Sequence, residues 1–271
     1  MEQESWLQLN EAVCVITGAA GGIGHEIARA LAGQRARLVL LDRDLAQCQQ
    51  LADELADRAG VEVTAMECDI ADPASVQAAA ARVEHRFGGC DVLINNASVL
   101  RPAALADISL EQWNQVLEVN LTGYLLCSQQ FGRLMLAQGA GRIVHVSSIA
   151  AHYPQTYSGA YSAAKTAVSM LSRQLAAEWG EHGIRSNSVC PGLILTPLSA
   201  SFYEDEEVAR RRRQMTASRR IGKPQDIADA VLFLASPRSD YINGAELTVD
   251  GGLEAMPMAL IPRPGYEAAK A

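Results

Sequence analysis

Lysine is scarce in this sequence, which has three lysines against twenty arginines among its 271 residues. Basic residues as a whole are outnumbered by acidic ones, 23 against 31, and the formal net charge is −8. A chain with this charge does not attract a polyanion, so we expect no nucleic-acid partner. No apolar run approaches the roughly 18 residues that cross a bilayer, so we expect no membrane partner either.

Paired cysteines and metal-binding spacings are also missing. The six cysteines contain no CxxC motif and lie in apolar or helical stretches; they are Cys14, Cys48, Cys68, Cys90, Cys127 and Cys190. The five histidines form no metal-ligand spacing with them or with one another, so we expect no metal. Buried thiols are typical of a reducing compartment and the acidic N-terminus has no targeting pattern, so we expect a cytoplasmic protein.

The one basic cluster, four arginines at 210–213, directly follows an acidic stretch at 204–207. Glu206 and Arg210, like Glu207 and Arg211, are four residues apart, which is the spacing of ion pairs on a helix. We therefore interpret the cluster as a solvated helix face rather than a basic binding patch.

Short β-branched runs alternate with longer helical segments along the chain. The runs lie at 12–17, 37–42, 61–67, 91–95, 142–148, 184–190 and 245–250. This alternation predicts an α/β fold with a seven-stranded parallel sheet, covered by helices on both faces and doubly wound in the Rossmann manner. Since no repeat or linker interrupts the pattern, we expect one domain over residues 1–271.

The first predicted strand runs into a glycine-rich turn, TGAAGGIG at 17–24, which opens a helix. Gly18, Gly22 and Gly24 allow a tight turn and expose helix N-terminal N–H groups to a pyrophosphate. A glycine cluster alone can serve a purely steric turn. Here a strand precedes it, a helix follows it, and an acid lies 18 residues beyond Gly24. Together these features predict a dinucleotide site.

That acid, Asp42, ends the second predicted strand, where its carboxylate can accept hydrogen bonds from the adenosine ribose. The same charge would repel a 2′-phosphate, so NAD is favoured over NADP. Arg43 could bind such a phosphate, but neighbouring side chains at a strand end point to opposite sides. The glycine loop also has no basic residue at position 21.

The spacing TGxxxGxG, rather than GxGxxG, resembles the classical short-chain dehydrogenase/reductase family, and the match runs from Thr17 to Gly252. In the family's order the chain has CD ending at Asp69, NNA at 95–97, Asn120 in EVNLTG, VSS at 146–148, Tyr161 with Lys165, PG at 191–192 followed by Thr196, and a closing VDGG. The ordered set is far more specific than any one of these motifs.

The resemblance implies which residues bind the cofactor, with Asp69 beside the adenine ring and the 95–97 stretch along the ribose. The implied set is Gly18, Gly22, Ile23, Gly24, Asp42, Arg43, Asp69, Ile70, Asn96, Ala97, Tyr161, Lys165, Pro191, Gly192 and Thr196. One position departs from the family, which usually continues NNAG where this chain has Ser98. A serine would be strained there if the position needs a positive φ.

Tyr161 and Lys165 are one helical turn apart, so they share a face with the apolar residues Ala164 and Val168. A free phenol is a poor base at neutral pH, and a nearby ammonium favours the phenolate. We therefore expect Lys165 to lower the pKa of Tyr161, and its compact head could also reach the ribose hydroxyls. Taken alone, the YxxxK match could equally be a surface pair.

Two further polar residues fit the same site. Asn120 lies on the apolar stripe of its helix with Leu117 and Tyr124, so it needs a polar partner. It could pin a helix bend; by resemblance it holds a water beside the lysine. Ser148 ends a predicted strand at the sheet edge where doubly wound folds bind ligands, so its hydroxyl can donate to a substrate oxygen. Ser147 points to the other face and is expected to serve structure.

These residues predict hydride transfer between a secondary alcohol and NAD. The expected catalytic residues are Asn120, Ser148, Tyr161 and Lys165. Tyr161 would take the alcohol proton while Ser148 holds the developing oxyanion. Ser148, Gln155 and Tyr161 are the expected substrate-binding residues. The polar segment at 149–159, with His152 and Gln155, favours a polyol or sugar, while small cyclic or aryl alcohols and steroid-like or acyl substrates stay open.

Two C-terminal segments have expected roles. Residues 193–215 correspond by resemblance to a mobile substrate lid, with a plain surface loop as the alternative. The tail, 253–271, has an apolar patch that includes Met256, Met258 and Ile261, and prolines interrupt it. We expect it to dock over the site or across a subunit boundary, with simple end disorder as the alternative. By resemblance the chain forms a homotetramer or a homodimer.

Two other functions stay open. The chain could bind NAD as a regulatory protein without turnover, although such a binder would need only the glycine loop and Asp42. It could instead be an NADPH-linked ketoreductase of acyl substrates, which the charge of Asp42 and the lack of a basic docking surface disfavour.

Overall fold

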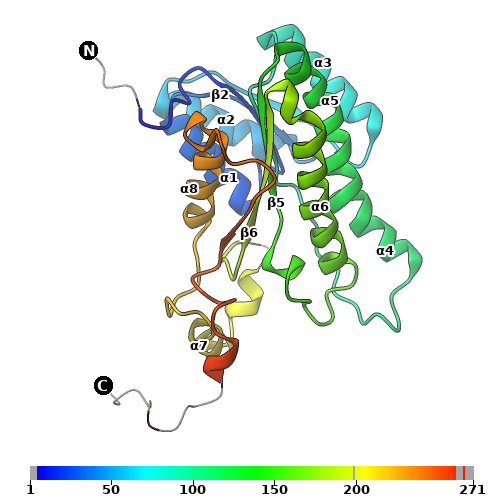
Figure 1. Cartoon of the computed structure of the whole chain (residues 1–271), viewed down its shortest axis with the longest axis vertical. Coiled ribbons are helices and arrows are strands. Elements are labelled where there is room, and N and C mark those ends of the chain that lie inside the picture. The colour runs from blue at the N-terminus through cyan, green and yellow to red at the C-terminus, as the bar shows by residue number, and fades with distance from the viewer. Residues whose placement is uncertain (1–4, 198, 261–264, 266–271) are drawn as a thin grey trace.

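The computed structural model describes residues 5–197, 199–260 and 265, and a seven-stranded sheet between two layers of helices forms its centre (Figure 1). The strands are β1 (Val13–Thr17), β2 (Arg37–Asp42), β3 (Val63–Glu67), β4 (Val92–Asn95), β5 (Gly141–Val146), β6 (Ile184–Pro191) and β7 (Glu246–Val249). Every neighbouring pair is parallel, in the order β3-β2-β1-β4-β5-β6-β7. This confirms the predicted fold, and no strand end differs from its predicted place by more than two residues.

Eight α-helices in the described residues cover the sheet and its C-terminal edge. They are α1 (Gly22–Gly33), α2 (Leu45–Ala59), α3 (Pro73–Phe87), α4 (Leu110–Leu117), α5 (Gly123–Gln138), α6 (Tyr161–Trp179), α7 (Glu206–Met215) and α8 (Pro224–Ala235). Figure 1 shows α1, α2 and α8 on one face and α3, α5 and α6 on the other. Short turns of helix join them: η1 (Glu118–Thr122, of the π type), η2 (Ile149–Ala151), η3 (Gly180–His182), η4 (Ala200–Tyr203), η5 (Pro237–Ser239) and η6 (Pro257–Leu260).

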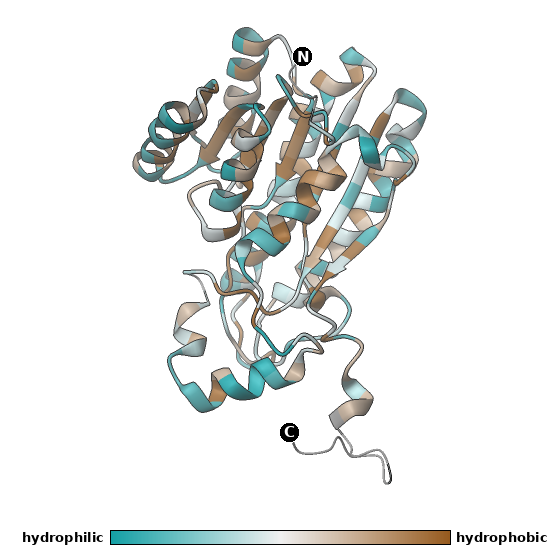
Figure 2. Cartoon of the chain, turned by 90° about the vertical axis from the view of Figure 1, so that its left-hand side faces the viewer, coloured by the Kyte–Doolittle hydropathy of each residue, from teal (hydrophilic) through white to brown (hydrophobic). Residues whose placement is uncertain are grey.

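The central strands β1, β2 and β4 are largely apolar on both sides because each side packs on a helix layer. In β1, Cys14 and Ile16 join the core under α1 and α8, whereas Val13 and Val15 join the core under α3 and α5. Figure 2 shows the central strands in brown, between helices that carry many hydrophilic residues. Burial on both faces fixes the register of the sheet, and with it the positions of the loops that follow each strand.

The strand order reverses between β1 and β4. After β1 the chain moves outward to β2 and β3, and it then returns to β4 on the other side of β1. The loops after these two strands therefore part in opposite directions, which opens a crevice at their C-terminal ends. The sheet topology thus places the glycine turn after β1 beside the NNAS loop after β4.

The arginine cluster lies on α7, and its side chains form ion pairs on an exposed helix face as predicted. Glu207 binds both Arg210 and Arg211, at 2.7 Å each. The predicted pairing of Glu206 with Arg210 is wrong, because Arg210 makes a two-pronged bond with Glu207 and Glu206 binds Arg213 instead.

The six cysteines are buried free thiols, as expected. Among the described residues, no helix has both the length and the apolar character needed to cross a membrane. Met256 and Ala259 of the tail lie beside Gln214 and Met215 at the end of α7, while Met258 is 81% exposed. The other end of the predicted apolar patch, at 261, lies outside the described residues.

Candidate active site

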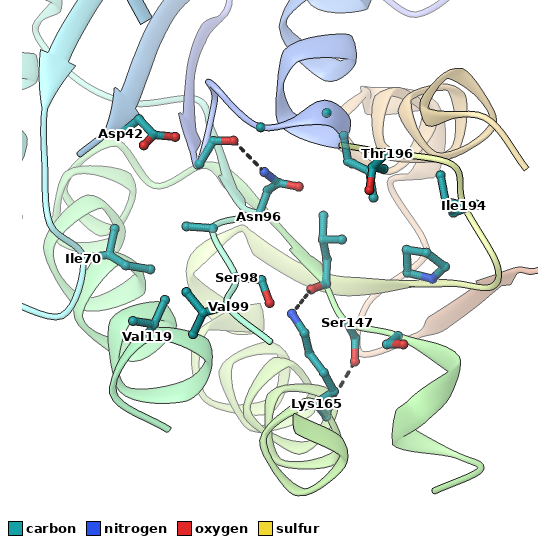
Figure 3. A pocket seen from close by; sticks show the side chains of 18 of the residues that line it. Asp42, Ile70, Asn96, Ser98, Val99, Val119, Ser147, Lys165, Ile194 and Thr196 are labelled. Atoms are coloured by element: carbon teal, nitrogen blue, oxygen red, sulfur yellow. Dashed lines mark hydrogen bonds between the residues drawn. The ribbon is translucent and has the colours of Figure 1, made fainter. Parts of the chain in front are cut away.

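A cavity of about 410 Å³ opens at the C-terminal ends of the central strands (Figure 3). It brings together most of the residues that the sequence predicted for the site: Gly18, Gly22, Ile23, Asp42, Arg43, Asp69, Ile70, Asn96, Ala97, Ser148, Tyr161, Lys165, Pro191, Gly192 and Thr196. Three predicted residues do not line it, namely Gly24, Asn120 and Gln155. The physical reason for which each residue lies outside the cavity lining differs among the three.

Gly24 serves packing inside the glycine turn. A Cβ at this position would lie 2.2 Å from the Gly18 carbonyl oxygen and 2.6 Å from Asn96 Nδ2. Gly18 has a φ of +65°, and a Cβ there would lie 2.6 Å from the Cα of Ala97. Asn96 Nδ2 donates to the Thr17 and Gly18 carbonyls at 3.1 and 3.0 Å, which fastens the β4 loop to this turn. Only glycines allow the two loops to approach this closely.

Asn120 fixes the loop after β4 and does not bond to Lys165. It is fully buried in the π-type turn η1, where its Oδ1 accepts from Val99 N and its Nδ2 donates to Val99 O, both at 2.8 Å. The Asn120 side chain thus holds the loop that carries Ser98, and its expected role beside the lysine stays a prediction. A π-bulge at this point is consistent with a functional site.

Gln155 is exposed, and its backbone N–H donates to Ser162 Oγ at 3.1 Å. After Ser148 the chain turns through η2, which carries residues 152–157 to the surface. Gln155 lies outside the cavity, and its contact with substrate stays a prediction. The polar composition of the segment gave no information about its direction.

At the adenosine end of the cavity, Asp42 accepts hydrogen bonds from the backbone N–H groups of Ala20 and Asp44 at 3.2 and 3.1 Å. These bonds hold its carboxylate at the edge of the cavity. The expectation that Arg43 points away is wrong, since Arg43 lines the same cavity and its Nη1 lies 4.0 Å from Asp69 Oδ2. The strand ends at Asp42, so side-chain alternation no longer governs Arg43.

Lys165 is 1% exposed, and its Nζ donates to the Val146 carbonyl at 2.8 Å and contacts the Tyr124 hydroxyl at 3.3 Å. In the described part of the chain no carboxylate pairs with it, and burial lowers its pKa to about 7. Nζ lies 5.6 Å from the centre of the Tyr161 ring, so the predicted proximity is confirmed.

The predicted net lowering of the Tyr161 pKa is wrong in this structure, because burial raises the pKa of Tyr161. The hydroxyls of Ser148 and Ser98 act in the opposite direction and favour the phenolate. The sequence argument included the cation but not the loss of water around the phenol.

Ser148 and Ser147 have separate tasks, as predicted. Ser148 Oγ lies in the cavity and accepts from Ala150 N at 3.1 Å, so its own proton remains available to another acceptor. Ser147 Oγ donates to the Lys165 carbonyl at 3.0 Å (Figure 3) and contacts Ser169, which ties β5 to α6.

The cavity also includes residues that were not among the individually predicted site residues. They are Gly21, Cys68, Ser98, Val99, Val119, Val146, Ser147, Ile194 and Pro197. Most are apolar wall residues with no chemical signal. Ile194, Thr196 and Pro197 open the expected lid segment, and a Cβ on Gly22 would lie 2.9 Å from Pro197 Cδ, so this segment begins directly against the glycine turn.

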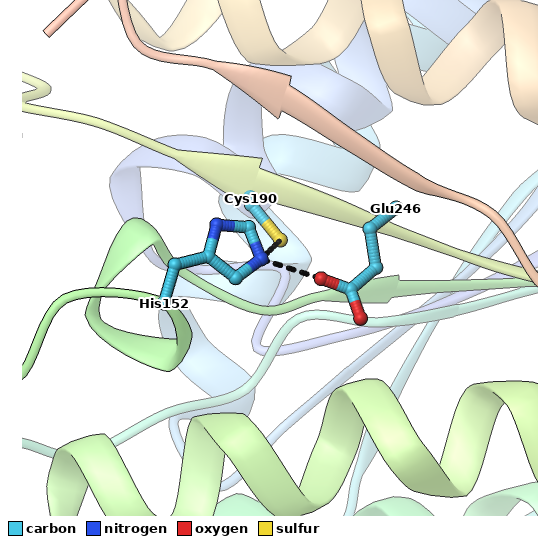
Figure 4. A group of neighbouring side chains, drawn as sticks. All are labelled: His152, Cys190 and Glu246. Carbon is cyan, nitrogen blue, oxygen red and sulfur yellow. Dashed lines mark hydrogen bonds and ion pairs between the residues drawn. The ribbon is translucent and has the colours of Figure 1, made fainter. Parts of the chain in front are cut away.

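His152 belongs to a second polar cluster outside the cavity (Figure 4). Its Nε2 lies 2.5 Å from Glu246 and its Nδ1 lies 2.7 Å from Glu254, while Arg173 also binds Glu246. The bond with Glu246, followed by that with Glu254, raises the pKa of His152 against the effect of burial. His152, Cys190 and Glu246 have ligand atoms within 4.8 Å of one another, but burial raises the pKa of Cys190 to about 11, so its sulfur stays a thiol. The cluster is built as a set of ion pairs.

A family model described as enoyl-(acyl carrier protein) reductase matches residues 18–254. The chain belongs to the classical short-chain dehydrogenase/reductase family. Its similarity to members of this family extends over the glycine turn, the NNAS loop and the Tyr161–Lys165 helix, all of which lie within the matched residues.

Characterised short-chain dehydrogenase/reductase proteins match over nearly their whole length. Galactitol 2-dehydrogenase (L-tagatose-forming) from Cereibacter sphaeroides is 38% identical, across 93% of this chain and 98% of that protein. Cis-4-hydroxycyclohexanecarboxylate dehydrogenase from Sinomonas cyclohexanicum is 40% identical, across 91% and 98%. The crystal structure of a gluconate 5-dehydrogenase from Burkholderia cenocepacia in complex with NADP and tartrate has a TM-score of 0.87 at 34% identity, across 91% and 96%. The protein is therefore an oxidoreductase that acts between an alcohol and a ketone.

Proposed function

We propose that the protein is an NAD-dependent dehydrogenase that interconverts a secondary alcohol and its ketone, with a polyol or sugar alcohol as the substrate class. The observation that carries this proposal is the arrangement of Tyr161, Lys165 and Ser148 on the same cavity as the glycine turn and Asp42. A protein that only bound the dinucleotide would not need the first three.

The residues at the cavity suit a dinucleotide. The turn at Gly18 would receive the pyrophosphate, Asp42 would accept bonds from the adenosine ribose, and Lys165 would donate to the nicotinamide ribose. When bound, the nicotinamide supplies the hydride acceptor or donor of the reaction. The Asp42 carboxylate favours NAD, while Arg43 beside it is the group that would receive a 2′-phosphate if NADP bound instead.

The chain's own residues handle the proton. Tyr161 takes the hydroxyl proton of the alcohol as general base, and Ser148 donates a hydrogen bond to the same substrate oxygen. Burial raises the pKa of Tyr161, so at neutral pH the phenol is protonated and ready to give its proton to a ketone. Alcohol oxidation needs the phenolate, and its rate is therefore expected to rise with pH.

The substrate class is supported by the relatives rather than by the cavity alone. One relative is named for galactitol and another for a hydroxycyclohexanecarboxylate, so polyols and small cyclic alcohols are the two classes to compare first. We place the protein in the cytoplasm as a homotetramer or homodimer, with residues 193–215 as the lid of the site, on the strength of the family resemblance.

Replacing Tyr161 with Phe tests the proposal directly. We expect kcat to fall by about 10²–10⁴-fold, because the proton acceptor is lost, while the affinity for NAD changes little. Tyr241→Phe is the matched control, since Tyr241 is fully exposed. Turnover of polyols and cyclic alcohols is measured through the reduced nicotinamide absorbance. Retained turnover in the Tyr161→Phe protein would remove the catalytic assignment.

A second substitution tests the cofactor. Asp42→Ser should lower the ratio of kcat/KM with NAD to that with NADP by at least about tenfold, because the repulsion of the 2′-phosphate is gone. Asp57→Ser, on the exposed face of α2, removes the same charge away from the cavity and should leave the ratio unchanged. An unchanged ratio in the Asp42 variant would mean that another residue discriminates between NAD and NADP, and Arg43 would be tested next.

A further inference from the structure

Ser98 stands where the family usually has glycine, yet its backbone is unstrained. The non-glycine residues with positive φ in the described chain are Gln8, Glu11, Arg35, Tyr157 and Arg219, so Ser98 has an ordinary φ. The serine side chain therefore costs the loop nothing in backbone strain. Its presence needs a reason other than loop geometry.

The Ser98 hydroxyl is buried and has no hydrogen-bond partner of good geometry within the described residues. It lines the cavity, and Figure 3 shows it directed toward the part of the pocket that holds Lys165. A buried hydroxyl without a partner is costly, by more than a typical hydrogen bond contributes. Such a group is expected to acquire its partner when the site carries out its function.

The loop holds Ser98 firmly in this position. On one side the Ala97 N–H donates to Thr17 Oγ1 at 3.2 Å. On the other side both backbone groups of Val99 bond to the Asn120 side chain at 2.8 Å. With both neighbours fixed, the Ser98 side chain can change its rotamer but the residue cannot move away from the cavity.

Ser98 lines the same cavity as the Tyr161 phenol, next to the part that holds Lys165. The hydroxyls of Ser148 and Ser98 both favour the charged form of this phenol and so lower the pKa of Tyr161. These two hydroxyls come from different loops, after β5 and after β4. In the proposed reaction Ser148 must turn its proton to the substrate oxygen. At that moment the Tyr161 oxygen loses one donor, and Ser98 is the hydroxyl that remains beside it.

We propose that Ser98 is a second hydroxyl donor to the Tyr161 oxygen, which it stabilises in the phenolate form while Ser148 binds the substrate oxygen. In the oxidation direction the alcohol O–H bond breaks and its proton moves to the Tyr161 oxygen. Ser98 keeps its own proton throughout and only donates a hydrogen bond. This inference rests on the proposed function and gives the chain a donor that glycine at this position cannot supply.

The test compares Ser98→Ala, which loses the hydroxyl, with Ser98→Thr, which keeps it. In alcohol oxidation we expect Ser98→Ala to lower kcat/KM about tenfold on the acid side of the pH profile and to approach the native value at the alkaline plateau. Ser98→Thr should follow the native profile. Ser172→Ala is the matched control, because Ser172 is a buried hydroxyl that faces Ser186 rather than the cavity.

A second measurement needs no cofactor or turnover. The ultraviolet phenolate band that is lost in Tyr161→Phe should appear at higher pH in Ser98→Ala than in the native protein. An unchanged titration, or a loss of kcat/KM by the same factor at every pH, would overturn the role of Ser98. If Tyr161→Phe abolishes turnover in the same assays, such a result would leave the proposed function intact and remove only this inference.

Discussion

Lys165 lies in α6 and His152 directly follows η2, and their surroundings differ sharply. Lys165 is 1% exposed and, among the described residues, bonds only to the neutral groups of Val146 and Tyr124. The His152 side chain is 28% exposed and lies between two carboxylates, from Glu246 and Glu254. Burial lowers the pKa of the lysine to about 7, whereas the carboxylates raise that of the histidine.

The comparison separates two uses of charge within one fold. In the His152 cluster, opposite charges from the η2 region, β7 and the residues after it bind one another, so the cluster stabilises the folded chain. In the cavity a cation is buried without a counter-ion, so Lys165 destabilises the folded chain until a ligand or a reaction uses it. Functional sites commonly carry such a cost.

Among the substitutions that test this comparison, Lys165→Met is expected to change activity and stability the most. Activity should fall by about 10²–10³-fold, because the ribose and phenol lose their cation. The free energy of unfolding should rise by about 1–3 kcal/mol at neutral pH, because a buried unpaired charge is replaced by an apolar chain of similar size. Chemical denaturation and turnover are measured on the same preparations.

The stability gained in Lys165→Met is expected to depend on pH, because the pKa of Lys165 is lowered in the folded chain. Below about pH 7 Lys165 is charged in both the folded and unfolded chain, so its full cost is present. Between that pH and the ordinary pKa of 10.5 only the unfolded chain stays charged, so native stability rises and the advantage of the Met variant shrinks. Lys223→Met, at an exposed lysine, should show neither effect. A destabilised Lys165→Met protein would mean that the lysine has a partner in solution.

Much of the cavity could be predicted because its residues carry a chemical signal in the sequence. The glycine turn, Asp42 and the Tyr161–Lys165 pair have spacings that a helix or a turn converts directly into geometry. Val119, Val146 and Ile194 carry no such signal, since an apolar residue becomes a cavity wall only through tertiary packing. The central strands β1, β2 and β4 were predicted closely because burial on both faces leaves a plain apolar run.

The errors have a common physical cause, which is that sequence spacing does not reveal burial or distant partners. The pKa of Tyr161 rises because of lost solvation, a property of the folded cavity. Asn120 meets Val99, 21 residues away, and His152 meets Glu246, 94 residues away. Gln155 shares its polar segment with His152, but the turn at η2 directs both away from the cavity.

His152→Gln is expected to have a smaller effect than Lys165→Met, and it tests the second member of the comparison, the His152 cluster. Glutamine keeps hydrogen-bonding capacity but not the positive charge, so we expect the free energy of unfolding to fall by about 1 kcal/mol near pH 6. Because the folded pKa of His152 is raised above its ordinary value of 6.5, the native advantage is full below that value. It is lost as the pH rises through the folded pKa, where the imidazole becomes neutral and can donate to only one carboxylate.

The matched control for this variant is His182→Gln, which alters an exposed histidine 3.7 Å from Glu181 and should change stability very little. Activity of His152→Gln should stay within a few-fold of native, since the cluster lies outside the cavity. If stability is unchanged while kcat falls by orders of magnitude, His152 acts in the chemistry and the division between the two clusters is wrong. If stability falls only on the acid side of the folded pKa of His152 and kcat is retained, the charge at His152 holds the η2 region to Glu246 and Glu254. The proton chemistry then belongs to the cavity.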